Sequence, residues 1–244
     1  MEAPEEIRSV AVIPAAGRGR RAGDRMKVYR PICGRPALAW TLDAFERCYL
    51  VDAVVVVAAR DDVEYCLNEI VEKEGFGKVR MVIAGGRERQ DSVAGALRRL
   101  REEDWDCVVV HDGARPLVRT DLIEDVVMAG RLFGAATAAV PVKDTVKEVR
   151  DGVVVRTIPR EDLWAVQTPQ AFRLDLLNRA HSEAAAGRVK GTDDAMLVER
   201  LGAQVRIVDG DYDNIKVTTA CDFAVAEALL AARLHAEKGE CEGR

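Results

Sequence analysis

Histidine is scarce and long apolar runs are missing from this chain of 244 residues, whose three histidines are His111, His181 and His235. They are scattered too widely to suggest a histidine-rich zinc site, so any bound metal should have oxygen ligands. The longest strongly apolar runs, such as residues 53–59, fall well short of the roughly 20 residues that a membrane-spanning helix needs. We therefore expect no membrane-spanning segment.

Cysteine pairs, a signal peptide and a large net charge are also missing from the sequence. The six cysteines include no C-x-x-C pair, and residues 1–8 lack the basic start and the apolar stretch of a signal peptide. Charged residues make up 32% of the chain but the net charge is only −5, which argues against a nucleic-acid-binding polycation and against a disordered acidic tail. We expect a cytoplasmic protein with reduced thiols and a small-molecule partner, with no nucleic acid and no membrane among its partners.

Short β-branched apolar runs alternate with amphipathic stretches through the first half of the chain. Such runs are typical of strands covered on both faces, and the stretches between them carry apolar residues at helical spacing. This alternation predicts an α/β fold with a single doubly wound, mostly parallel, Rossmann-like sheet. The predicted strands cover residues 10–13, 54–58, 79–84, 108–110 and 135–140, and the predicted helices cover residues 37–48, 62–74, 92–103 and 122–133.

The pattern changes after Pro141. Residues 145–149 and 153–158 flank Asp151 and Gly152, a pair that favours a tight β-hairpin. A two-stranded ribbon is only marginally stable alone, so we expect a protruding β-arm at about residues 142–160 that packs on a second copy of the chain, as a homodimer. Helices at residues 174–186 and 193–201, a strand at 204–208 and a helix at 219–236 would complete one domain, residues 1–236, before a C-terminal tail at 237–244.

The first predicted strand ends in a glycine-rich loop over residues 14–21. A loop of this kind at the carboxyl end of a parallel strand lets the backbone approach a ligand closely. From Arg18 to Arg35 seven residues are Arg or Lys and only Asp24 is acidic, an excess suited to a polyphosphate. The loop matches neither a G-x-G-x-x-G dinucleotide motif nor a G-K-[ST] P-loop. The alternative is a simple turn whose arginines are solvated.

Asp112 follows the apolar run at residues 108–110 and should lie at the same edge of the sheet as the first loop. Magnesium prefers one or two carboxylates together with substrate phosphate oxygens, so Asp112 is a candidate Mg²⁺ ligand. An aspartate that caps the following turn is the alternative. His111 is better explained as a buried, hydrogen-bonded histidine than as a ligand or a base.

Eight short motifs follow one another from the first predicted strand to the start of the last helix. They are A-A-G-x-G-x-R at residues 15–21, Lys27, G-G-x-x-R-x-x-S-V at 85–93, H-D-G-A-R-P at 111–116, P-V-K-D-T at 141–145, Q-T-P-Q at 167–170, T-D-D at 192–194 and D-N-I-K-V-T at 213–218. Together they are far more specific than one glycine-rich loop. The chain resembles the 2-C-methyl-D-erythritol 4-phosphate cytidylyltransferase family.

The resemblance implies a reaction. The family transfers CMP from CTP to methylerythritol 4-phosphate, giving 4-diphosphocytidyl-2-C-methyl-D-erythritol and diphosphate in non-mevalonate isoprenoid precursor biosynthesis. Such a transfer needs positioning and charge neutralisation more than a covalent nucleophile. The resemblance also implies Mg²⁺, or another divalent cation, as the cofactor.

Roles for individual residues follow from the same resemblance. Arg21, Lys27 and Lys216 would be catalytic residues at the CTP phosphates, and Asp112 would hold the metal. Arg89 would also order the loop of residues 85–93. The CTP-binding residues would be Ala15, Ala16, Gly17, Gly19, Gly85, Gly86, Arg89 and Ser92, and the acceptor-binding residues would be Arg115, Thr145, Arg160, Thr168 and Thr192, some of them supplied by the second copy.

Without the resemblance, several of these residues have a simpler interpretation. Lys216 would be an outward-facing lysine on an edge strand, and Arg160 would be a solvated surface residue. The segment 192–194 would serve as the N-cap and the acidic first turn of a helix. A structural role and a substrate contact can coexist in the segment 192–194.

One segment departs from the family pattern. The family usually has Pro-Lys-Gln-Tyr around the loop lysine, whereas this chain has Met26, Lys27, Val28 and Tyr29. Methionine in place of proline removes a fixed φ, so we expect a more mobile loop before CTP binds. Two other functions stay open: a ribitol-5-phosphate cytidylyltransferase, and a catalytically silent nucleotide-binding subunit.

Overall fold

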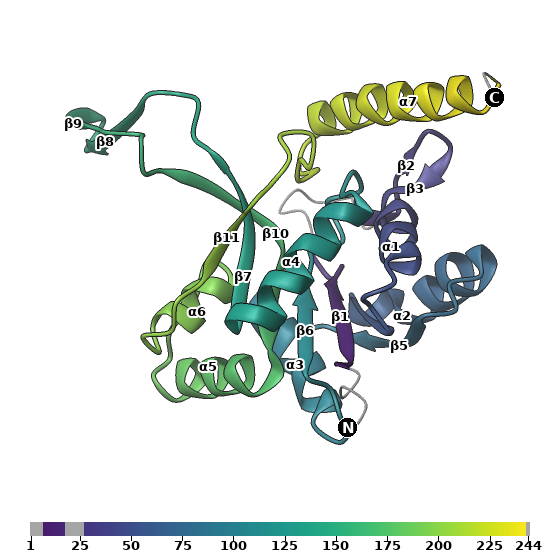
Figure 1. Cartoon of the computed structure of the whole chain (residues 1–244), viewed down its shortest axis with the longest axis horizontal. Helices are drawn as coiled ribbons and strands as arrows, with labels where there is room; N and C mark the ends of the chain where they lie inside the picture. The colour runs from purple at the N-terminus through teal and green to yellow at the C-terminus, as the bar shows by residue number, and fades with distance from the viewer. Residues whose placement is uncertain (1–6, 18–26, 243–244) are drawn as a thin grey trace, which may run out of the picture.

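The computed structural model describes residues 7–17 and 27–242, with side chains up to residue 236. Its main sheet has the strand order β11-β7-β10-β6-β1-β4-β5, and among these strands only β10 runs antiparallel to its neighbours (Figure 1). The strands are β1 (Ser9–Pro14), β4 (Ala53–Ala58), β5 (Val79–Ala84), β6 (Cys107–Val110), β7 (Ala135–Pro141), β10 (Trp164–Arg173) and β11 (Arg206–Asp209).

Alternating side chains of the central strands build a core on each face of the sheet. In β1, Ala11 and Ile13 point into one buried cluster, while Val10 and Val12 point into the other. Successive residues of a strand face opposite sides, so a strand with apolar residues on both sides must be covered on both faces. The predicted doubly wound, mostly parallel sheet is therefore confirmed.

Helices cover both faces. The first cluster receives α1 (Ala37–Arg47), α4 (Thr120–Phe133) and the short α2 (Val63–Tyr65) with the π-helical segment η3 (Cys66–Glu72), and the second receives α3 (Arg89–Leu100), α5 (Leu174–Ala186) and α6 (Asp194–Glu199). The last helix, α7 (Ala220–Glu242), packs against Ile32 and Leu117 in a third cluster. The remaining short elements are η1 (Lys27–Tyr29), β2 (Pro31–Ile32), β3 (Arg35–Pro36) and η2 (Arg60–Asp62).

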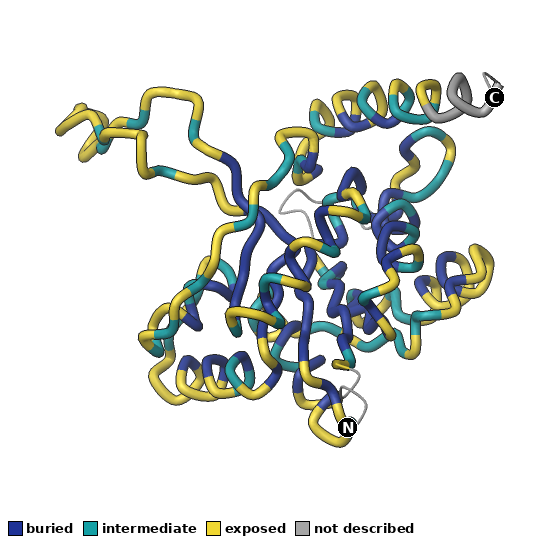
Figure 2. The backbone as a smooth tube through the Cα atoms, in the orientation of Figure 1, coloured by how far each residue is buried: buried dark blue, intermediate teal, exposed yellow. Residues whose placement is uncertain are grey.

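The predicted hairpin is present as β8 (Val146–Arg150) and β9 (Val153–Ile158). Asp151 and Gly152 join the two strands with φ values of 49° and 78°, as a type I′ turn requires at both central positions. The hairpin forms a sheet of its own, and it projects away from the main sheet with most of its surface exposed (Figures 1 and 2).

Besides the short strands β2 and β3, which were not predicted, the structure differs from the expected elements in three places. The strand β10 was not predicted, and it enters the sheet between β6 and β7. Between β4 and β5, the chain that was expected to form one regular helix instead combines 3₁₀, α and π winding. The helix α7 continues to Glu242, beyond its expected end at Ala236 and through much of the expected tail. In the part of the chain that is described, no helix has both the length and the apolar character needed to cross a membrane.

Candidate active site

A pocket of about 850 Å³ opens at the carboxyl ends of β1, β4, β5 and β6. This edge is where open parallel sheets bind ligands, because the strand-to-helix loops meet there. Residues from distant parts of the sequence share the pocket wall: 14–17, 27–28, 59–61, 85–89, Ser92, Asp112, Ala114 and 216–218. The pocket therefore contains most of the residues that the sequence singled out.

One wall of the pocket is the loop between β5 and α3. Two local contacts support its conformation: Gly86 donates its N–H to the Ser92 Oγ at 3.1 Å, and a capping box joins Glu88 and Asp91 at the start of the helix. A Cβ added at Gly85 would lie 2.6 Å from the Ala16 Cβ and 2.8 Å from the Ser92 Oγ. The absence of a side chain at Gly85 thus lets this loop approach the first loop closely.

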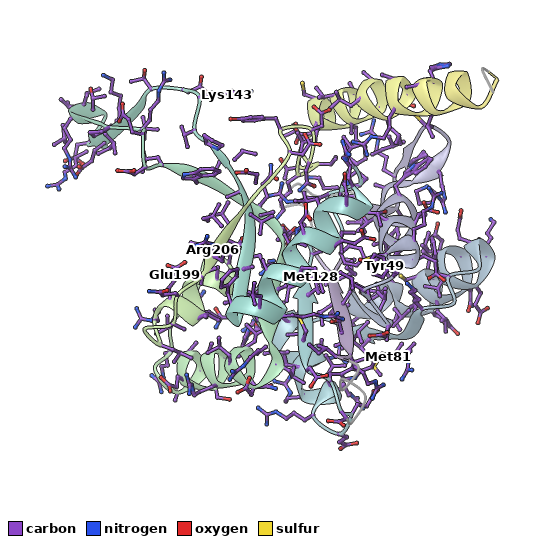
Figure 3. All side chains as sticks on the ribbon, viewed as in Figure 1. Tyr49, Met81, Met128, Lys143, Glu199 and Arg206 are labelled. Carbon is purple, nitrogen blue, oxygen red and sulfur yellow. The ribbon has the colours of Figure 1, made fainter. Side chains whose placement is uncertain are left out.

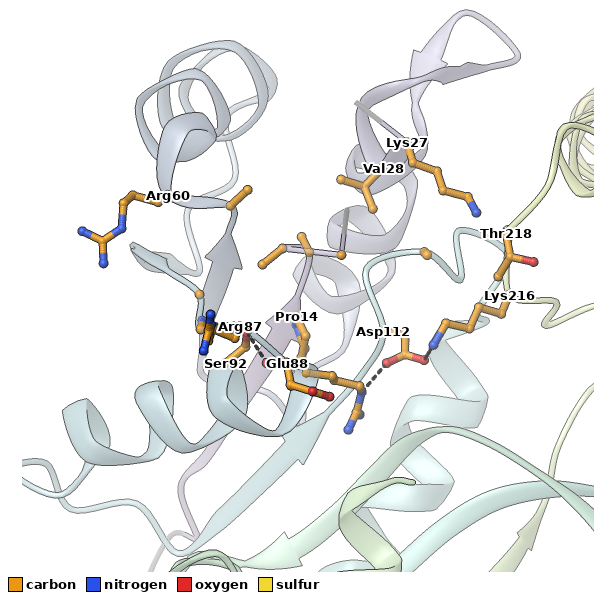
Figure 4. A pocket seen from close by; sticks show the side chains of 18 of the residues that line it. Pro14, Lys27, Val28, Arg60, Arg87, Glu88, Ser92, Asp112, Lys216 and Thr218 are labelled. Carbon is orange, nitrogen blue, oxygen red and sulfur yellow. Dashed lines mark hydrogen bonds and ion pairs between the residues drawn. The ribbon is translucent and has the colours of Figure 1, made fainter. Parts of the chain in front are cut away.

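Asp112 forms the floor of the pocket and is held by three side chains. Its backbone N–H donates to the Thr168 Oγ1 at 3.0 Å, and its carboxylate lies 2.7 Å from the Arg89 Nε and 2.7 Å from the Lys216 Nζ (Figure 4). Burial would raise the pKa of this carboxyl, but the charges of Arg89 and Lys216 outweigh burial and hold the pKa well below its usual range. Asp112 is ionised at neutral pH.

Arg89 joins Asp112 to a second buried carboxylate. Its Nη1 lies 2.7 Å from Asp194, which has 1% of its side chain exposed and accepts a further contact from the His181 Nε2 at 2.9 Å. Burial raises the pKa of Asp194, but the charge of Arg89 reverses the direction and lowers it. The Arg89 side chain is therefore fixed between two acids at the bottom of the pocket.

Lys216 reaches the pocket from the segment after β11, which is not a strand in the structure. Hydrogen bonds fix this segment: Val217 donates its N–H to the Ala114 carbonyl at 2.8 Å, and the buried Asn214 donates its Nδ2 to the Thr168 carbonyl at 2.8 Å. The explanation of Lys216 as a lysine on an edge strand is therefore wrong. Its ammonium group faces the pocket instead.

Lys27 also lines the pocket. It begins η1, whose next residues Val28 and Tyr29 are buried and anchor the turn to the core. The Lys27 side chain extends toward the segment that carries Lys216 and Thr218 (Figure 4). Two lysines thus border the space in front of Asp112.

His111, next to Asp112, has no exposed surface, and its Nε2 lies 3.3 Å from the Arg115 carbonyl oxygen. Burial lowers its pKa to about 3, so the imidazole is neutral at physiological pH. This agrees with the expectation of a buried, hydrogen-bonded histidine.

The structure brings most, but not all, of the expected site residues together. Arg115 and Thr168 are adjacent to the pocket through their contacts with Asp112. Gly19 and Arg21 lie outside the described residues, as does Met26. The lining includes Ala15, Ala16, Gly17, Lys27, Gly85, Gly86, Arg89, Ser92, Asp112 and Lys216, whereas Thr145, Arg160 and Thr192 do not belong to it.

Other residues of the site were not singled out from the sequence. Residues 59–61, Glu88 and Thr218 also line the pocket. Asp194 was expected only in a helix start, and its ion pair with Arg89 places it beneath the pocket floor. The available signal was an acidic pair before an apolar helix, which does not reveal a distant partner.

An ionised carboxylate beside lysines in a glycine-walled pocket suits the transfer of a nucleotidyl group. The pocket can neutralise a polyphosphate, and its walls leave room for a base. The fold and the pocket together define an α/β nucleotidyltransferase.

Comparisons with known proteins identify the particular family. The chain belongs to the 2-C-methyl-D-erythritol 4-phosphate cytidylyltransferase family, whose model matches residues 9–232. It is 49% identical over 227 residues to the family member of Geobacter metallireducens, covering 92% of this chain and 98% of that protein. It is 50% identical over 225 residues to that of Pelotomaculum thermopropionicum, covering 91% and 94%.

Solved structures agree. The 4-diphosphocytidyl-2C-methyl-D-erythritol synthase of Anaerococcus prevotii superposes with a TM-score of 0.83 at 34% identity, covering 93% of this chain and 97% of that chain. The 2-C-methyl-D-erythritol 4-phosphate cytidylyltransferase of Thermus thermophilus gives a TM-score of 0.74 at 35% identity, covering 91% and 98%. The chain is therefore a methylerythritol 4-phosphate cytidylyltransferase enzyme of the non-mevalonate pathway.

Proposed function

We propose that the pocket around Asp112 is where the cytidylyl group is transferred. The observation that carries this proposal is the ionised Asp112 carboxylate, held at 2.7 Å by the Lys216 ammonium group on the pocket floor. Lys27 and Lys216, together with Arg21, contact the triphosphate of CTP. An oxygen of the acceptor phosphate attacks the α-phosphorus, a bond to that phosphorus forms, and diphosphate leaves with the electrons of the broken bond.

The cationic side chains have two tasks in this reaction. They neutralise the charge of the triphosphate while it binds, and they stabilise the additional charge that develops on the α-phosphoryl oxygens and on the leaving diphosphate. Lys216 has 43% of its side chain exposed, so it can move from Asp112 toward the phosphates when CTP enters. Arg89 stays in place because Asp194 holds its other end.

The glycine-walled end of the pocket suits the cytosine base. Ala15, Ala16, Gly17, Gly85, Gly86 and Ser92 border it. Small residues leave space for a pyrimidine, and exposed backbone groups can hydrogen-bond with its edge. Gly19 would donate its backbone amide to the phosphates.

Asp112 is the group that would hold Mg²⁺. This site fits the ion, because the Asp112 carboxylate is ionised and opens onto the pocket, where phosphate oxygens would complete the coordination. Among the described residues no cluster of three or more His, Cys, Asp or Glu side chains could hold a metal without such help. When bound, Mg²⁺ would neutralise phosphate charge.

The acceptor phosphate is bound on the Thr168 side of Asp112. Arg115 lies 3.9 Å from that carboxylate, and the Thr168 Oγ1 accepts the Asp112 backbone N–H in the same chain. Thr192 precedes Asp194 by two residues in the sequence. Thr145 and Arg160, in contrast, lie at the root of the β-arm and outside the pocket lining of their own chain. We assign these two to the site of a second copy.

The β-arm supports this assignment as a homodimer contact. Its valines are open to solvent, with Val149, Val153, Val154 and Val155 each more than half exposed. The root of the arm, where Figure 3 labels Lys143, is held to the body because the Lys143 Nζ lies 3.2 Å from the centre of the Tyr212 ring. Within the root, Arg160 donates to the Lys143 carbonyl. A fixed root and an apolar tip suit an arm of residues 142–160 that reaches another copy of the single domain, residues 1–236.

The first experiment measures diphosphate release with CTP, Mg²⁺ and methylerythritol 4-phosphate. Lys27→Ala should lower kcat/KM by about a hundredfold or more, as expected for loss of one transition-state contact. Lys73→Ala, an exposed lysine of the surface pair with Glu69, is the control and should be near wild type. Faster release with ribitol 5-phosphate than with methylerythritol 4-phosphate would contradict the acceptor.

A second experiment tests whether two copies build each acceptor site. Lys27→Ala and Arg160→Ala should each be nearly inactive, but a refolded equal mixture should regain up to about a quarter of wild-type activity, because half of the dimers carry one intact site of two. Lys27→Ala mixed with Lys216→Ala is the control, since both changes affect the pocket of the same chain. No recovery in the first mixture would show that Arg160 does not act on the second copy.

A further inference from the structure

The first turn of α3 touches two parts of the protein. On one side it carries Ser92, whose Oγ accepts the Gly86 N–H and so holds the loop that walls the nucleotide pocket. On the other side Gln90 faces the segment that leads to Thr192. Any displacement of this turn would therefore shift both the loop that walls the nucleotide pocket and the segment that leads to Thr192.

Gln90 holds that segment by its backbone. Its Nε2 donates to the Val189 carbonyl at 3.2 Å, and its Oε1 accepts the Gly191 N–H at 2.9 Å. The Gln90 side chain is half-buried, so these bonds are only partly open to competition from water. One amide group thus clamps both ends of a three-residue turn.

The clamped segment has little freedom of its own. A Cβ added at Gly191 would lie 2.7 Å from the Leu197 Cδ2 and 2.9 Å from the Asp193 carbonyl oxygen. After it, Asp193 caps α6 by accepting the Met196 N–H at 3.0 Å, and it also accepts the Gln170 Nε2 at 2.7 Å. Thr192 therefore lies between two residues whose positions are fixed, Gly191 and Asp193, and Gln90 sets the position of Gly191.

We propose that Gln90 is a positioning residue that couples nucleotide binding at the Gly85–Gly86 loop to acceptor binding at Thr192. The inference rests on the proposed function, because the contact between Thr192 and the acceptor is itself proposed. When CTP fixes the loop and the first turn of α3, Gln90 fixes Thr192 for the acceptor phosphate. Coupling between two sites is reciprocal, so each substrate binds more tightly when the other is present.

Two other side-chain contacts join the start of α3 to the segment around Thr192. Both are ion pairs, whereas Gln90 makes hydrogen bonds to the backbone. Arg89 with Asp194 belongs to the catalytic floor and cannot be changed without altering Asp112. The Lys190 Nζ lies 2.8 Å from the Glu88 Oε1, but these side chains are 81% and 58% exposed, so their ion pair contributes little. Lys190 is consequently a matched control for Gln90.

The test uses Gln90→Met, which keeps the length of the side chain but removes both hydrogen bonds, and Lys190→Met as the control. Calorimetry measures the Kd of methylerythritol 4-phosphate with and without the α,β-methylene analogue of CTP. Gln90→Met should weaken acceptor binding in the presence of the analogue by about tenfold, as expected for two lost hydrogen bonds, with the Kd of the analogue alone unchanged. In steady-state assays the KM of the acceptor should rise by a similar factor, with kcat within about twofold of wild type.

Thr192→Ala separates failure of this inference from failure of the proposed acceptor contact. If Thr192→Ala leaves acceptor binding unchanged, the proposed contact is wrong, and the coupling falls with it. If Thr192→Ala weakens binding but Gln90→Met does not, only the role of Gln90 is wrong. Positioning through Thr192 also predicts that Gln90→Met adds little in a Thr192→Ala background. If Gln90→Met does not fold, Gln90→Glu replaces it, because it keeps an acceptor for Gly191 and loses the donor to Val189.

Discussion

Lys216 is the pocket cation whose contact with Asp112 is most easily exchanged for a substrate phosphate. Lys216→Met should leave the fold intact, since Arg89 still neutralises Asp112 from the other side at 2.7 Å. We expect kcat/KM for cytidylyl transfer to fall by about a hundredfold to a thousandfold, the usual loss when one transition-state donor is removed. Initial rates of diphosphate release measure this, with Lys73→Met as the control. A loss of less than about fivefold would contradict a catalytic role.

His111 should make the stability of the protein depend on pH. Its pKa in the folded chain is about 3, below its ordinary value, so the unfolded chain takes up a proton first as the pH falls. The stabilisation from a neutral His111 is complete above about pH 6.5 and is lost toward the folded pKa, by up to about 1.4 kcal/mol per pH unit.

His111→Asn keeps a side-chain donor for the Arg115 carbonyl but has no imidazole to protonate. Urea unfolding at pH 7, 6 and 5 should therefore give a flatter decline in the free energy of unfolding for the variant than for wild type. The difference in slope should correspond to about one proton. Parallel curves would show that His111 does not determine this part of the pH dependence.

Single residues of the site were predictable where the local pattern carried the information. Asp112 follows four buried β6 residues and one buried histidine, so its place at the sheet edge could be inferred from the apolar run alone. The ion pair between Arg89 and Asp194 could not be predicted from the sequence, because these residues are separated by 105 positions and no local pattern shows which surfaces meet. Only the completed fold brings them together.

At the scale of elements, β10 is the strand of the main sheet that could not be predicted from the sequence. Its buried positions include Gln167, Thr168 and Gln170, so the apolar alternation of a strand is interrupted. The structure satisfies these polar groups internally: the Gln170 Nε2 donates to the Thr137 Oγ1 at 3.0 Å and to Asp193 at 2.7 Å. Its antiparallel direction has a simple origin, since the β-arm turns the chain back beside β7.

The β-arm itself could be predicted, because a turn pair between two β-branched runs is local information. Its exposed face leads to a further prediction. Val153 and Val155 lie on the same side of β9 and are 68% and 51% exposed. If the arm packs on a second copy, Val153→Asp with Val155→Asp should shift the protein from dimer to monomer in sedimentation velocity, because charges would be buried without partners.

Met128 provides the control for this change. It is 55% exposed on α4, in the main body of the molecule (Figure 3). Met128→Asp should leave the sedimentation coefficient unchanged, and neither variant should lose much thermal stability as a single copy, since the substituted side chains face solvent. A dimer that survives both valine substitutions would contradict the assignment of the arm as the contact between copies.

At the scale of the whole molecule, charge is distributed unevenly. The chain carries a net charge of −5, yet seven basic residues and one acid occur between Arg18 and Arg35, and Lys27 from this segment borders the pocket. Arg89 and Lys216 add two more cations on the pocket floor. A protein that is acidic overall but cationic at one cleft attracts a polyphosphate to that cleft and repels it elsewhere.

Binding of CTP with Mg²⁺ should stabilise the whole fold, because the pocket residues come from β1, β5, β6 and the segment before α7. Ligand at about 100 times its Kd adds about 2.7 kcal/mol, which raises the Tm of a protein this large by about 5–10 °C. In EDTA the shift should be much smaller, since phosphate charge then faces the ionised Asp112 directly. Differential scanning fluorimetry compares these conditions, with MgATP as the control for base selection. Equal shifts with and without the metal would contradict Asp112 as the Mg²⁺ ligand.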